Sequence, residues 1–160
     1  MSMLELNHVN KTFNKGTINE KSALKDLTLT MNEGDFVTVI GGNGAGKSTM
    51  LNAIAGVWPI DEGSILINGE DVTGLADYHR AYLIGRVFQD PMMGTAPDMQ
   101  LVENIALAAR RGKSRTLRWG VTANEKEIYR AKLADLHLGL EDRLTQKVGL
   151  LSGGQRQALT

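Results

Sequence analysis

The residue types best suited to chemistry are gathered in one short stretch, which reads Gly-Gly-Asn-Gly-Ala-Gly-Lys-Ser from Gly41 to Ser48. Its spacing fits the pattern G-x-x-x-x-G-K-[ST] without a mismatch. The glycines allow successive backbone N–H groups to face a phosphate beside a helix N-terminus. We expect Lys47 to reach the β- and γ-phosphates and the Ser48 hydroxyl to coordinate Mg²⁺. The loop alone predicts nucleotide binding but leaves the nucleotide and the reaction open.

A strand, the glycine loop and a helix are predicted in that order around this stretch. Residues 35–40 are β-branched and nearly all apolar, a pattern typical of a strand covered on both faces in a parallel sheet. Residues 47–55 carry apolar side chains at helical spacing, and Gly56 follows where a helix C-cap is expected. This context is the one that a phosphate-binding loop requires.

The rest of the chain predicts further strands and then a helical region. Alternating apolar residues indicate strands over residues 3–13 and 23–31, and residues 63–69 and 84–89 indicate two more. From residue 98 to about 140 the spacing becomes helical, interrupted by a predicted loop over residues 113–122. The apolar residues at helical spacing are Leu101, Ile105, Leu107, Ile128, Leu133, Leu136 and Leu138.

A second motif, Leu-Ser-Gly-Gly-Gln, extends from Leu151 to Gln155. Ser152 followed by two glycines is suited to open a helix, with a hydroxyl and bare backbone N–H groups directed at an anion. An ordinary N-capped helix is the alternative for this motif taken alone. Its position downstream of a phosphate loop favours the anion-binding interpretation.

Together the two motifs resemble those of the ATP-binding cassette (ABC) ATPases, and Arg156 and Gln157 extend the match to the family's signature sequence. The resemblance covers essentially the whole chain. It implies the α/β class: a P-loop NTPase core with N-terminal antiparallel β strands and an inserted helical subdomain, incomplete at the C-terminus. It also implies one partial domain over residues 1–160, with the catalytic core over about 1–90 and the helical subdomain, ending in the signature, over about 91–160.

The resemblance also assigns residues to the expected site. Phe13 matches the aromatic residue that stacks on adenine, although an aromatic residue at such a position, taken alone, is more often a core residue. Gln89, in Val-Phe-Gln-Asp-Pro, matches the Q-loop glutamine that touches Mg²⁺ and the attacking water. Lys47 and Gln89 are thus the catalytic candidates, and Ser48 and Gln89 the metal candidates. The candidates for binding ATP are Phe13, Gly41, Gly42, Asn43, Gly44, Ala45, Gly46, Lys47, Ser48, Thr49, Ser152, Gly153, Gly154 and Gln155.

The family's assembly implies partners for this chain. Two such domains pack head to tail, so that the phosphate loop of one subunit and the signature of the other close over the same ATP. Loss of the γ-phosphate then opens the dimer. In the family the helical region after Gln89 docks a membrane permease. The resemblance therefore implies a homodimer, transmembrane permease subunits and, for an importer, a solute-binding protein.

The family pattern continues past the signature with a strand ending in Asp-Glu and with a switch histidine, whereas this chain stops at Thr160. His8, His79 and His137 occupy unmatched positions. We therefore expect a fragment of poor stability, with an exposed apolar sheet edge beside Ile40 and little or no turnover.

Composition limits the remaining possibilities. Lys plus Arg and Asp plus Glu number 18 each, so no overall charge favours nucleic acid, and none is expected as a partner. The chain has no cysteine, and its three histidines show no zinc spacing. It shows neither a secretory leader nor an apolar run long enough for a membrane span. A cytoplasmic protein, peripheral on the inner face of the cell membrane, is expected.

The leading hypothesis is the ATPase subunit of an importer for a small organic solute such as an amino acid, the solute being a matter of analogy. Alternatives are a soluble ABC protein acting on the ribosome or DNA, and a hydrolysis-incompetent fragment. The basic run from Arg110 to Arg118, followed by Trp119, could meet lipid headgroups or an acidic loop, although a solvated loop is the plainer interpretation. Met92, Met93 and Met99 are suited either to docking or to filling space.

Overall fold

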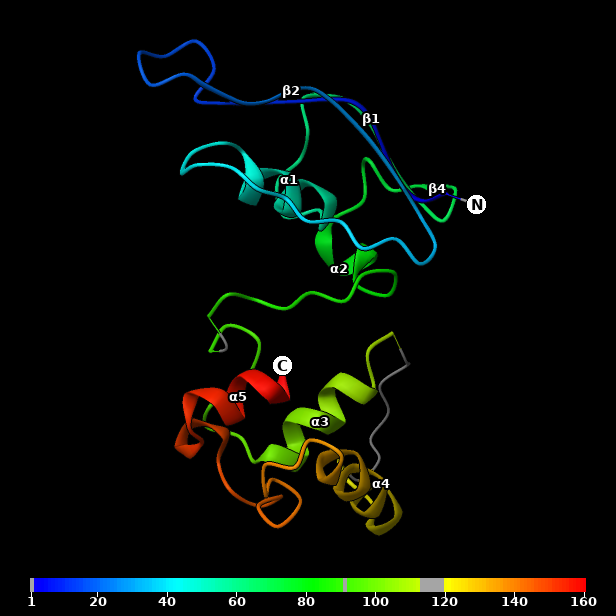
Figure 1. Ribbon diagram of the computed structural model, residues 1–160, viewed down its shortest axis with the longest axis vertical. Coiled ribbons are helices and arrows are strands. Elements are labelled where there is room, and N and C mark those ends of the chain that lie inside the picture. The colour runs from blue at the N-terminus through cyan, green and yellow to red at the C-terminus, as the bar shows by residue number, and fades with distance from the viewer. Residues whose placement is uncertain (1, 91, 113–119) are drawn as a thin grey trace. The chain divides into compact units, whose positions relative to one another are not determined.

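The computed structural model describes residues 2–90, 92–112 and 120–160 (Figure 1). It divides into two compact units, Met1–Gly85 and Arg86–Thr160. Each unit has its own cluster of buried apolar side chains and is considered by itself below.

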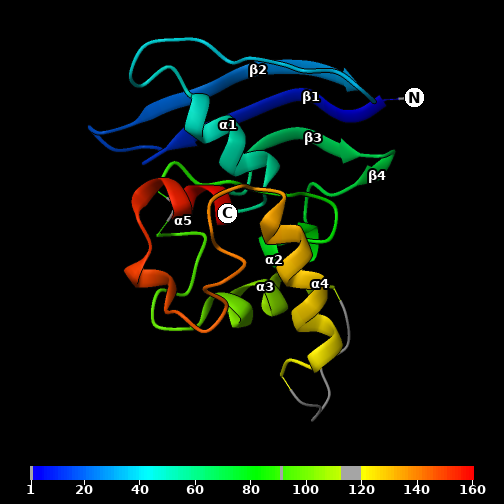
Figure 2. The same ribbon diagram turned by 60° about the horizontal axis from the view of Figure 1, so that its bottom comes forward.

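The first unit is built on a four-stranded antiparallel sheet (Figure 2). Its strands are β1 (Ser2–Phe13), β2 (Lys21–Asn32), β3 (Glu62–Ile67) and β4 (Glu70–Asp71), in the order β2-β1-β3-β4. The two N-terminal strands and the strand closed by a turn at Asn68 and Gly69 confirm the predictions from alternation. The sheet brings the ends of β1 and β2 together at Phe13 and Lys21, which are paired residues.

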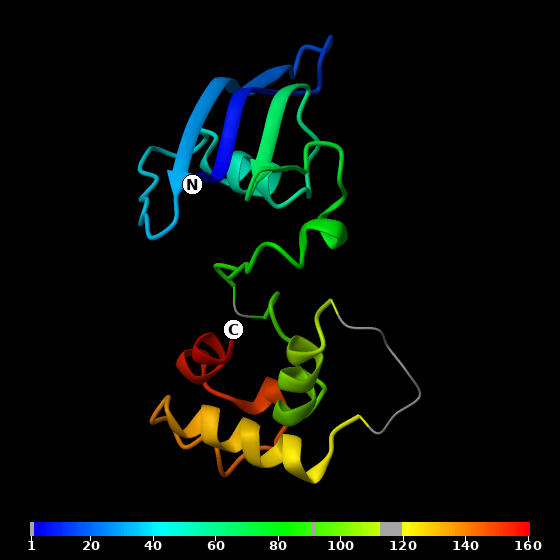
Figure 3. The same cartoon turned by 90° about the vertical axis from the view of Figure 1, so that its right-hand side faces the viewer.

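Helix α1 (Lys47–Ile54) packs against one face of this sheet (Figure 3). Met50 and Ala53 point from α1 into a core shared with β1, β2 and β3. The buried members of this core are Leu6, Val9, Leu24, Met50, Ala53, Ile65, Ile67 and Val72. A short helix, α2 (Asp77–Arg80), follows the sheet. The predicted helix after the glycine loop is confirmed, with Gly56 in the left-handed conformation just beyond its end.

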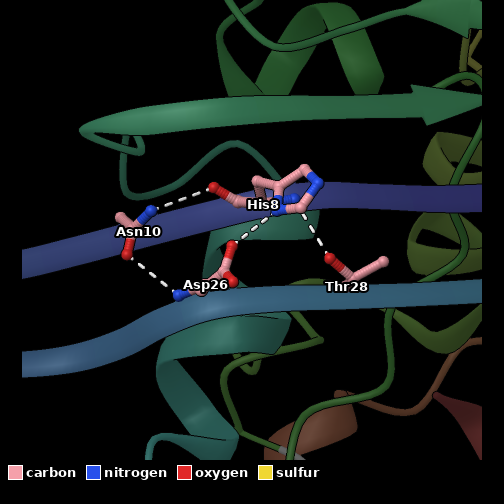
Figure 4. Close-up of polar contacts among 4 residues, drawn as sticks. All are labelled: His8, Asn10, Asp26 and Thr28. Carbon is pink, nitrogen blue, oxygen red and sulfur yellow. Dashed lines mark hydrogen bonds and ion pairs between the residues drawn. The ribbon is translucent and has the colours of Figure 1, made fainter.

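The register of β1 with β2 shifts at four points, and a polar cluster lies where His8 and Asp26 interrupt the regular pairing (Figure 4). His8 and Asp26 both adopt positive φ, at 51° and 48°, and their side chains meet at 2.6 Å. The Asp26 N–H donates to the side chain of Asn10, and the His8 N–H donates to the hydroxyl of Thr28. These side chains thus pair backbone N–H groups at irregular positions of the ladder. The side chains of His8 and Asp26 are more than 70% exposed, so their ion pair contributes little to stability. We infer that the cluster helps to set the register between β1 and β2.

The predictions of strands over residues 35–40 and 84–89 are wrong in this structure, where both segments lack regular structure. Phe36 and Ile40 are 94% and 90% exposed. A strand of the predicted kind needs neighbours to pair its backbone groups and cover both faces. Among the strands of the described residues, none pairs with either segment.

The second unit is helical, with α3 (Leu101–Ala109), α4 (Ala123–Ala134), a 3₁₀ turn η1 (Val148–Leu150) and α5 (Gly153–Leu159). Its core gathers Leu101, Val102, Ala106, Tyr129, Leu133, Leu140, Leu144, Val148 and Leu151. Leu101 and Leu133 confirm the predicted helical faces. Four other apolar residues of the predicted helical pattern, namely Leu107, Ile128, Leu136 and Leu138, are exposed. In the described part of the chain, no helix is both long and apolar enough to cross a membrane.

Candidate functional site

The glycine-rich stretch forms an open loop that leads directly into α1. Gly44 and Gly46 adopt φ values of 81° and 86°, which side chains other than glycine rarely tolerate. Gly46 is the N-cap of α1, and no side chain caps the helix. Its first turn also contains no acidic residue. The N–H groups at this helix N-terminus therefore face no carboxylate of their own helix, which suits them to an external anion.

Gly46 also permits a close approach between the loop and the sheet. A Cβ at this position would lie 2.4 Å from the carbonyl oxygen of Ala23 in β2. That distance is far below a normal contact, so any side chain here would push the loop away from the strand. The pattern's second glycine is thus required by packing as well as by backbone conformation.

Lys47 is folded back onto the loop that precedes it. Its Nζ donates to the carbonyl oxygens of Gly41 and Gly42 at 2.7 and 2.8 Å. Ser48 beside it is exposed, whereas Thr49 is 8% exposed. The predicted phosphate-contacting groups therefore lie at one end of α1, with the ammonium held at the loop and the Ser48 hydroxyl open to solvent.

Phe13 contributes an aromatic ring to the same unit, at the end of β1. Its ring meets that of Trp58 edge to face, with centroids 5.1 Å apart. The ammonium of Lys11 lies 5.5 Å from the centre of the Phe13 ring. Phe13 is half-buried, so part of its ring remains accessible. Trp58 thus supports the candidate base-stacking ring.

Asp61 makes hydrogen bonds to the end of β1, next to the Phe13 ring. It accepts from the Thr12 N–H at 2.6 Å and from Lys11 Nζ at 3.0 Å. The Thr12 N–H is the main cause that holds the pKa of Asp61 below its ordinary value, with Lys11 and Lys15 acting in the same direction against partial desolvation. Asp61 thereby ties the strand end next to Phe13 to the segment just after Trp58.

Gln89 lies in the second unit, in an exposed segment without regular structure. Just before it, the guanidinium of Arg86 lies over the Phe88 ring at 4.5 Å. Just after Gln89, the Asp90 carboxylate accepts from the Met92 N–H at 2.8 Å. The amide of Gln89 is therefore presented on an exposed segment.

The signature residues open α5 as the sequence predicts. Ser152 is the N-cap: its hydroxyl accepts from the Gln155 N–H at 3.3 Å, and the Gln155 side chain accepts from the Ser152 N–H at 3.2 Å. This reciprocal pair is a capping box. The Gln155 amide also donates to the carbonyl of Leu138 at 3.2 Å. Gly153 and Gly154 are exposed, with no atom within 4 Å of a Cβ at either position.

The predicted site residues are therefore distributed over both units. Phe13 and the loop through Thr49 belong to the first unit, and Gln89 and the signature belong to the second. Sequence patterns missed the contacts that Lys11, Trp58 and Asp61 make at the end of β1, next to or with Phe13. No motif marks these contacts, because Trp58 and Asp61 meet the end of β1 only after α1 has reversed the chain.

Three further predictions have mixed outcomes. In the basic run, Arg110 pairs with Glu125 at 3.3 Å, whereas Lys113, Arg115, Arg118 and Trp119 lie outside the described residues. Met92 and Met93 are exposed and Met99 is half-buried. For a metal, the described residues contain no cluster of three or more His, Cys, Asp or Glu. The Ser48 hydroxyl is a hard oxygen donor of the kind that Mg²⁺ takes together with substrate phosphates, so the residues fit that ion only as part of a nucleotide complex.

Comparison with known proteins shows the family to which the chain belongs. The family model for ABC transporter matches residues 24–160, and the chain belongs to this family. The tyrosine transport ATP-binding protein of Clostridioides difficile is 37% identical over 158 residues, which are 99% of this chain and 62% of that protein. The spermidine/putrescine import ATP-binding protein PotA of Haemophilus ducreyi is also 37% identical, over 99% of this chain and 38% of its own length. This chain thus spans less than two thirds of either relative.

Solved structures agree on the fold. A dimeric ATP-binding cassette, MJ0796, in a post-hydrolysis state bound to ADP and Pi has a TM-score of 0.75 and 32% identity, over 98% of this chain and 66% of that one. A nucleotide-free ATP-binding cassette from an ABC transporter has a TM-score of 0.73 and 28% identity, over 99% of this chain and 62% of that one. The predicted α/β class of P-loop NTPases is confirmed.

Proposed function

We propose that this chain is the nucleotide-binding part of an ABC transporter subunit that binds and hydrolyses ATP to drive transport through a separate permease. The observation that carries the proposal is the glycine loop at the uncapped N-terminus of α1, where the Lys47 ammonium donates a hydrogen bond to the loop backbone. An anion there meets backbone N–H groups, a helix dipole and an ammonium together. The family membership supports the same function.

In this proposal each candidate residue has a distinct part. The backbone of Gly41, Gly42, Asn43, Gly44, Ala45 and Gly46 surrounds the phosphates, while Thr49 and the rest of α1 hold the loop in place. Lys47 leaves the two loop carbonyls and contacts the β- and γ-phosphates. The accessible ring of Phe13 stacks on the adenine. Ser48 and Gln89 hold the Mg²⁺, which neutralises phosphate charge when it is bound.

We further propose that Ser152, Gly153, Gly154 and Gln155 act on the ATP bound by a second copy of the chain. The exposed glycines and the N-terminus of α5 give this segment open backbone donors. The related cassette MJ0796 is dimeric in its ADP- and Pi-bound state, which supports a head-to-tail pair. On this basis residues from 1 to about 90 act as the catalytic core and residues from about 91 to 160 as the helical subdomain.

The transported solute is proposed to be small and organic, with an amino acid favoured. One relative is named for tyrosine transport and another for spermidine/putrescine import. We propose a permease and a solute-binding protein as partners, with the chain on the inner face of the membrane.

The experiment that tests the proposal is a titration of ATP·Mg²⁺ into the chain and into Lys47→Ala, with heat of binding and phosphate release recorded separately. Lys47→Arg is the matched control, because it keeps the cation but changes its geometry. We expect binding that Lys47→Ala weakens by about tenfold or more and Lys47→Arg weakens less.

Equal affinity of the wild type and Lys47→Ala would refute binding at this loop. Absence of binding by a chain that melts cooperatively would refute the proposed function for this chain. Steady phosphate release would support the ATPase but contradict the expectation, drawn from the sequence, that this chain has little turnover.

A further inference from the structure

A second lysine lies beside the phosphate loop, outside the motif that defines it. Lys21 is the first residue of β2, and a Cβ at Gly44 would lie 3.3 Å from its Nζ. The neighbouring contact of Ala23 with the Gly46 position shows that the start of β2 runs directly along the loop. The ammonium of Lys21 therefore lies next to Gly44, on the side of the loop that faces β2.

The side chain of Lys21 belongs to an exposed residue. Over residues 2–90, 92–112 and 120–160 it makes neither a hydrogen bond nor an ion pair. Lys47, by contrast, already donates to two loop carbonyls. The ammonium groups of Lys21 and Lys47 and the N-terminus of α1 thus all lie at the loop, and the first turn of α1 contains no acidic residue. Such a concentration of positive charge is stabilised by a polyanion.

The register of the sheet connects this cation to the candidate base-stacking ring. Lys21 is the residue paired with Phe13 across β1 and β2. A side chain at this position is close enough to serve a ligand that has its base at Phe13 and its phosphates in the loop. A lysine on a strand next to the loop can contact phosphate oxygens from a direction that Lys47 does not reach.

Resting on the proposed function, we propose that Lys21 is a second phosphate-binding cation of the nucleotide site, which contacts the phosphates of the bound nucleotide from the β2 side. It acts by positioning and charge, and no bond is made or broken through it. Its contribution is to affinity for the phosphate chain, independent of the base.

The experiment compares Lys21→Ala, Lys21→Arg and Lys25→Ala by calorimetric titration with ATP·Mg²⁺ and with inorganic tripolyphosphate. Lys25→Ala is the matched control, since it removes the same charge from the same strand and its side chain is not among the nearest atoms to any loop glycine. We expect Lys21→Ala to weaken both ligands by about fivefold, and Lys21→Arg and Lys25→Ala to stay within about twofold of the wild type. All variants should melt at the wild-type temperature, because Lys21 is exposed.

A measurement on the unchanged chain complements the variants. Reductive methylation of lysines with and without ATP·Mg²⁺, followed by peptide mass spectrometry, should show protection of Lys21 relative to Lys25. If Lys47→Ala weakens ATP binding while Lys21→Ala matches Lys25→Ala for both ligands and Lys21 gains no protection, the proposal for Lys21 is wrong and the proposed function stands. If the wild type binds neither ligand, the proposed function itself fails, and the role of Lys21 fails with it.

Discussion

The guanidinium of Arg80 donates a hydrogen bond to the carbonyl oxygen of Ala53 at 2.8 Å, at the end of α1 opposite the phosphate loop. Arg80 is 2% exposed and also donates to the carbonyls of Ile54, Thr73 and Leu75. Burial is the main cause that lowers its pKa, and the charge of Asp71 opposes that shift. A cation at the negative end of the helix dipole thus fixes the end of α1 against the loops that follow the sheet.

We expect Arg80→Met to lower the free energy of unfolding by about 3 kcal/mol, because the carbonyls of Ala53 and Ile54 lose a buried donor. Urea unfolding followed by circular dichroism measures the change. Arg130→Met is the control, since Arg130 is 49% exposed and pairs only with Glu127 among the ionised side chains described, so the loss should stay below about 0.5 kcal/mol. Equal losses for the two variants would contradict the role assigned to Arg80.

Gly63 occupies a position in β3 that no side chain fits. Its φ is 93°, and a Cβ would lie 2.5 Å from the carbonyl oxygens of both Asn7 and His8. We expect Gly63→Ala to lower the free energy of unfolding by about 2 kcal/mol or more, because both backbone strain and the clash must be relieved. Gly74→Ala, with open space around it and no strained φ, should change it by less than about 0.5 kcal/mol. A tolerated Gly63→Ala would contradict the close pairing of β3 with the bulge at His8.

Asp61 predicts an acid-sensitive component of stability. Its folded pKa lies below the ordinary value, chiefly through the Thr12 N–H, so its contribution is present above about pH 4 and is lost as pH falls through the folded pKa. The free energy of unfolding of the wild type should therefore exceed that of Asp61→Asn near neutral pH. The difference should shrink as pH is lowered from about 5 toward 3. A difference that is constant over this range would rule out the ionised carboxylate as the cause.

Trp58 should contribute to the binding of the adenine base and not to the binding of the phosphates. We expect Trp58→Ala to weaken ATP binding by about threefold, because the Phe13 ring loses its edge-to-face support, with no change for inorganic tripolyphosphate. Trp58→Phe, which keeps an aromatic edge, is the control and should bind ATP nearly as the wild type does. Parallel weakening of both ligands by Trp58→Ala would indicate damage to the loop rather than to the base site.

The exposed apolar residues at 36–40 should be replaceable without loss of folding. Phe36 and Ile40 are at least 90% exposed, so Phe36→Ser combined with Ile40→Ser should lower the binding of a hydrophobic dye and change the free energy of unfolding by less than about 0.5 kcal/mol. Leu6→Ser, in the buried core, is the contrasting variant. A loss of several kcal/mol from the double variant would mean that the chain in solution buries this segment as a strand.

Local patterns were sufficient for features that neighbouring residues decide. The glycine loop, the helix after it and the capped start at Ser152 depend on backbone conformation and on contacts a few residues away, so they could be predicted. Strand pairing over residues 35–40 and 84–89 could not, because a strand exists only where another segment accepts its hydrogen bonds. The same limit applies to Leu107 and Ile128, whose apolar character fits a helical face that the second unit leaves exposed.

Residue types at fixed spacing were enough to predict a phosphate loop and the family of the chain. Which distant residues come together around α1 and this loop depends on the tertiary structure. It placed Trp58 against Phe13, Lys21 over Gly44 and Arg80 at the end of α1. These contacts depend on sheet register and on the reversal of the chain after α1, and no local pattern encodes either, since each is the outcome of packing the whole unit around one core.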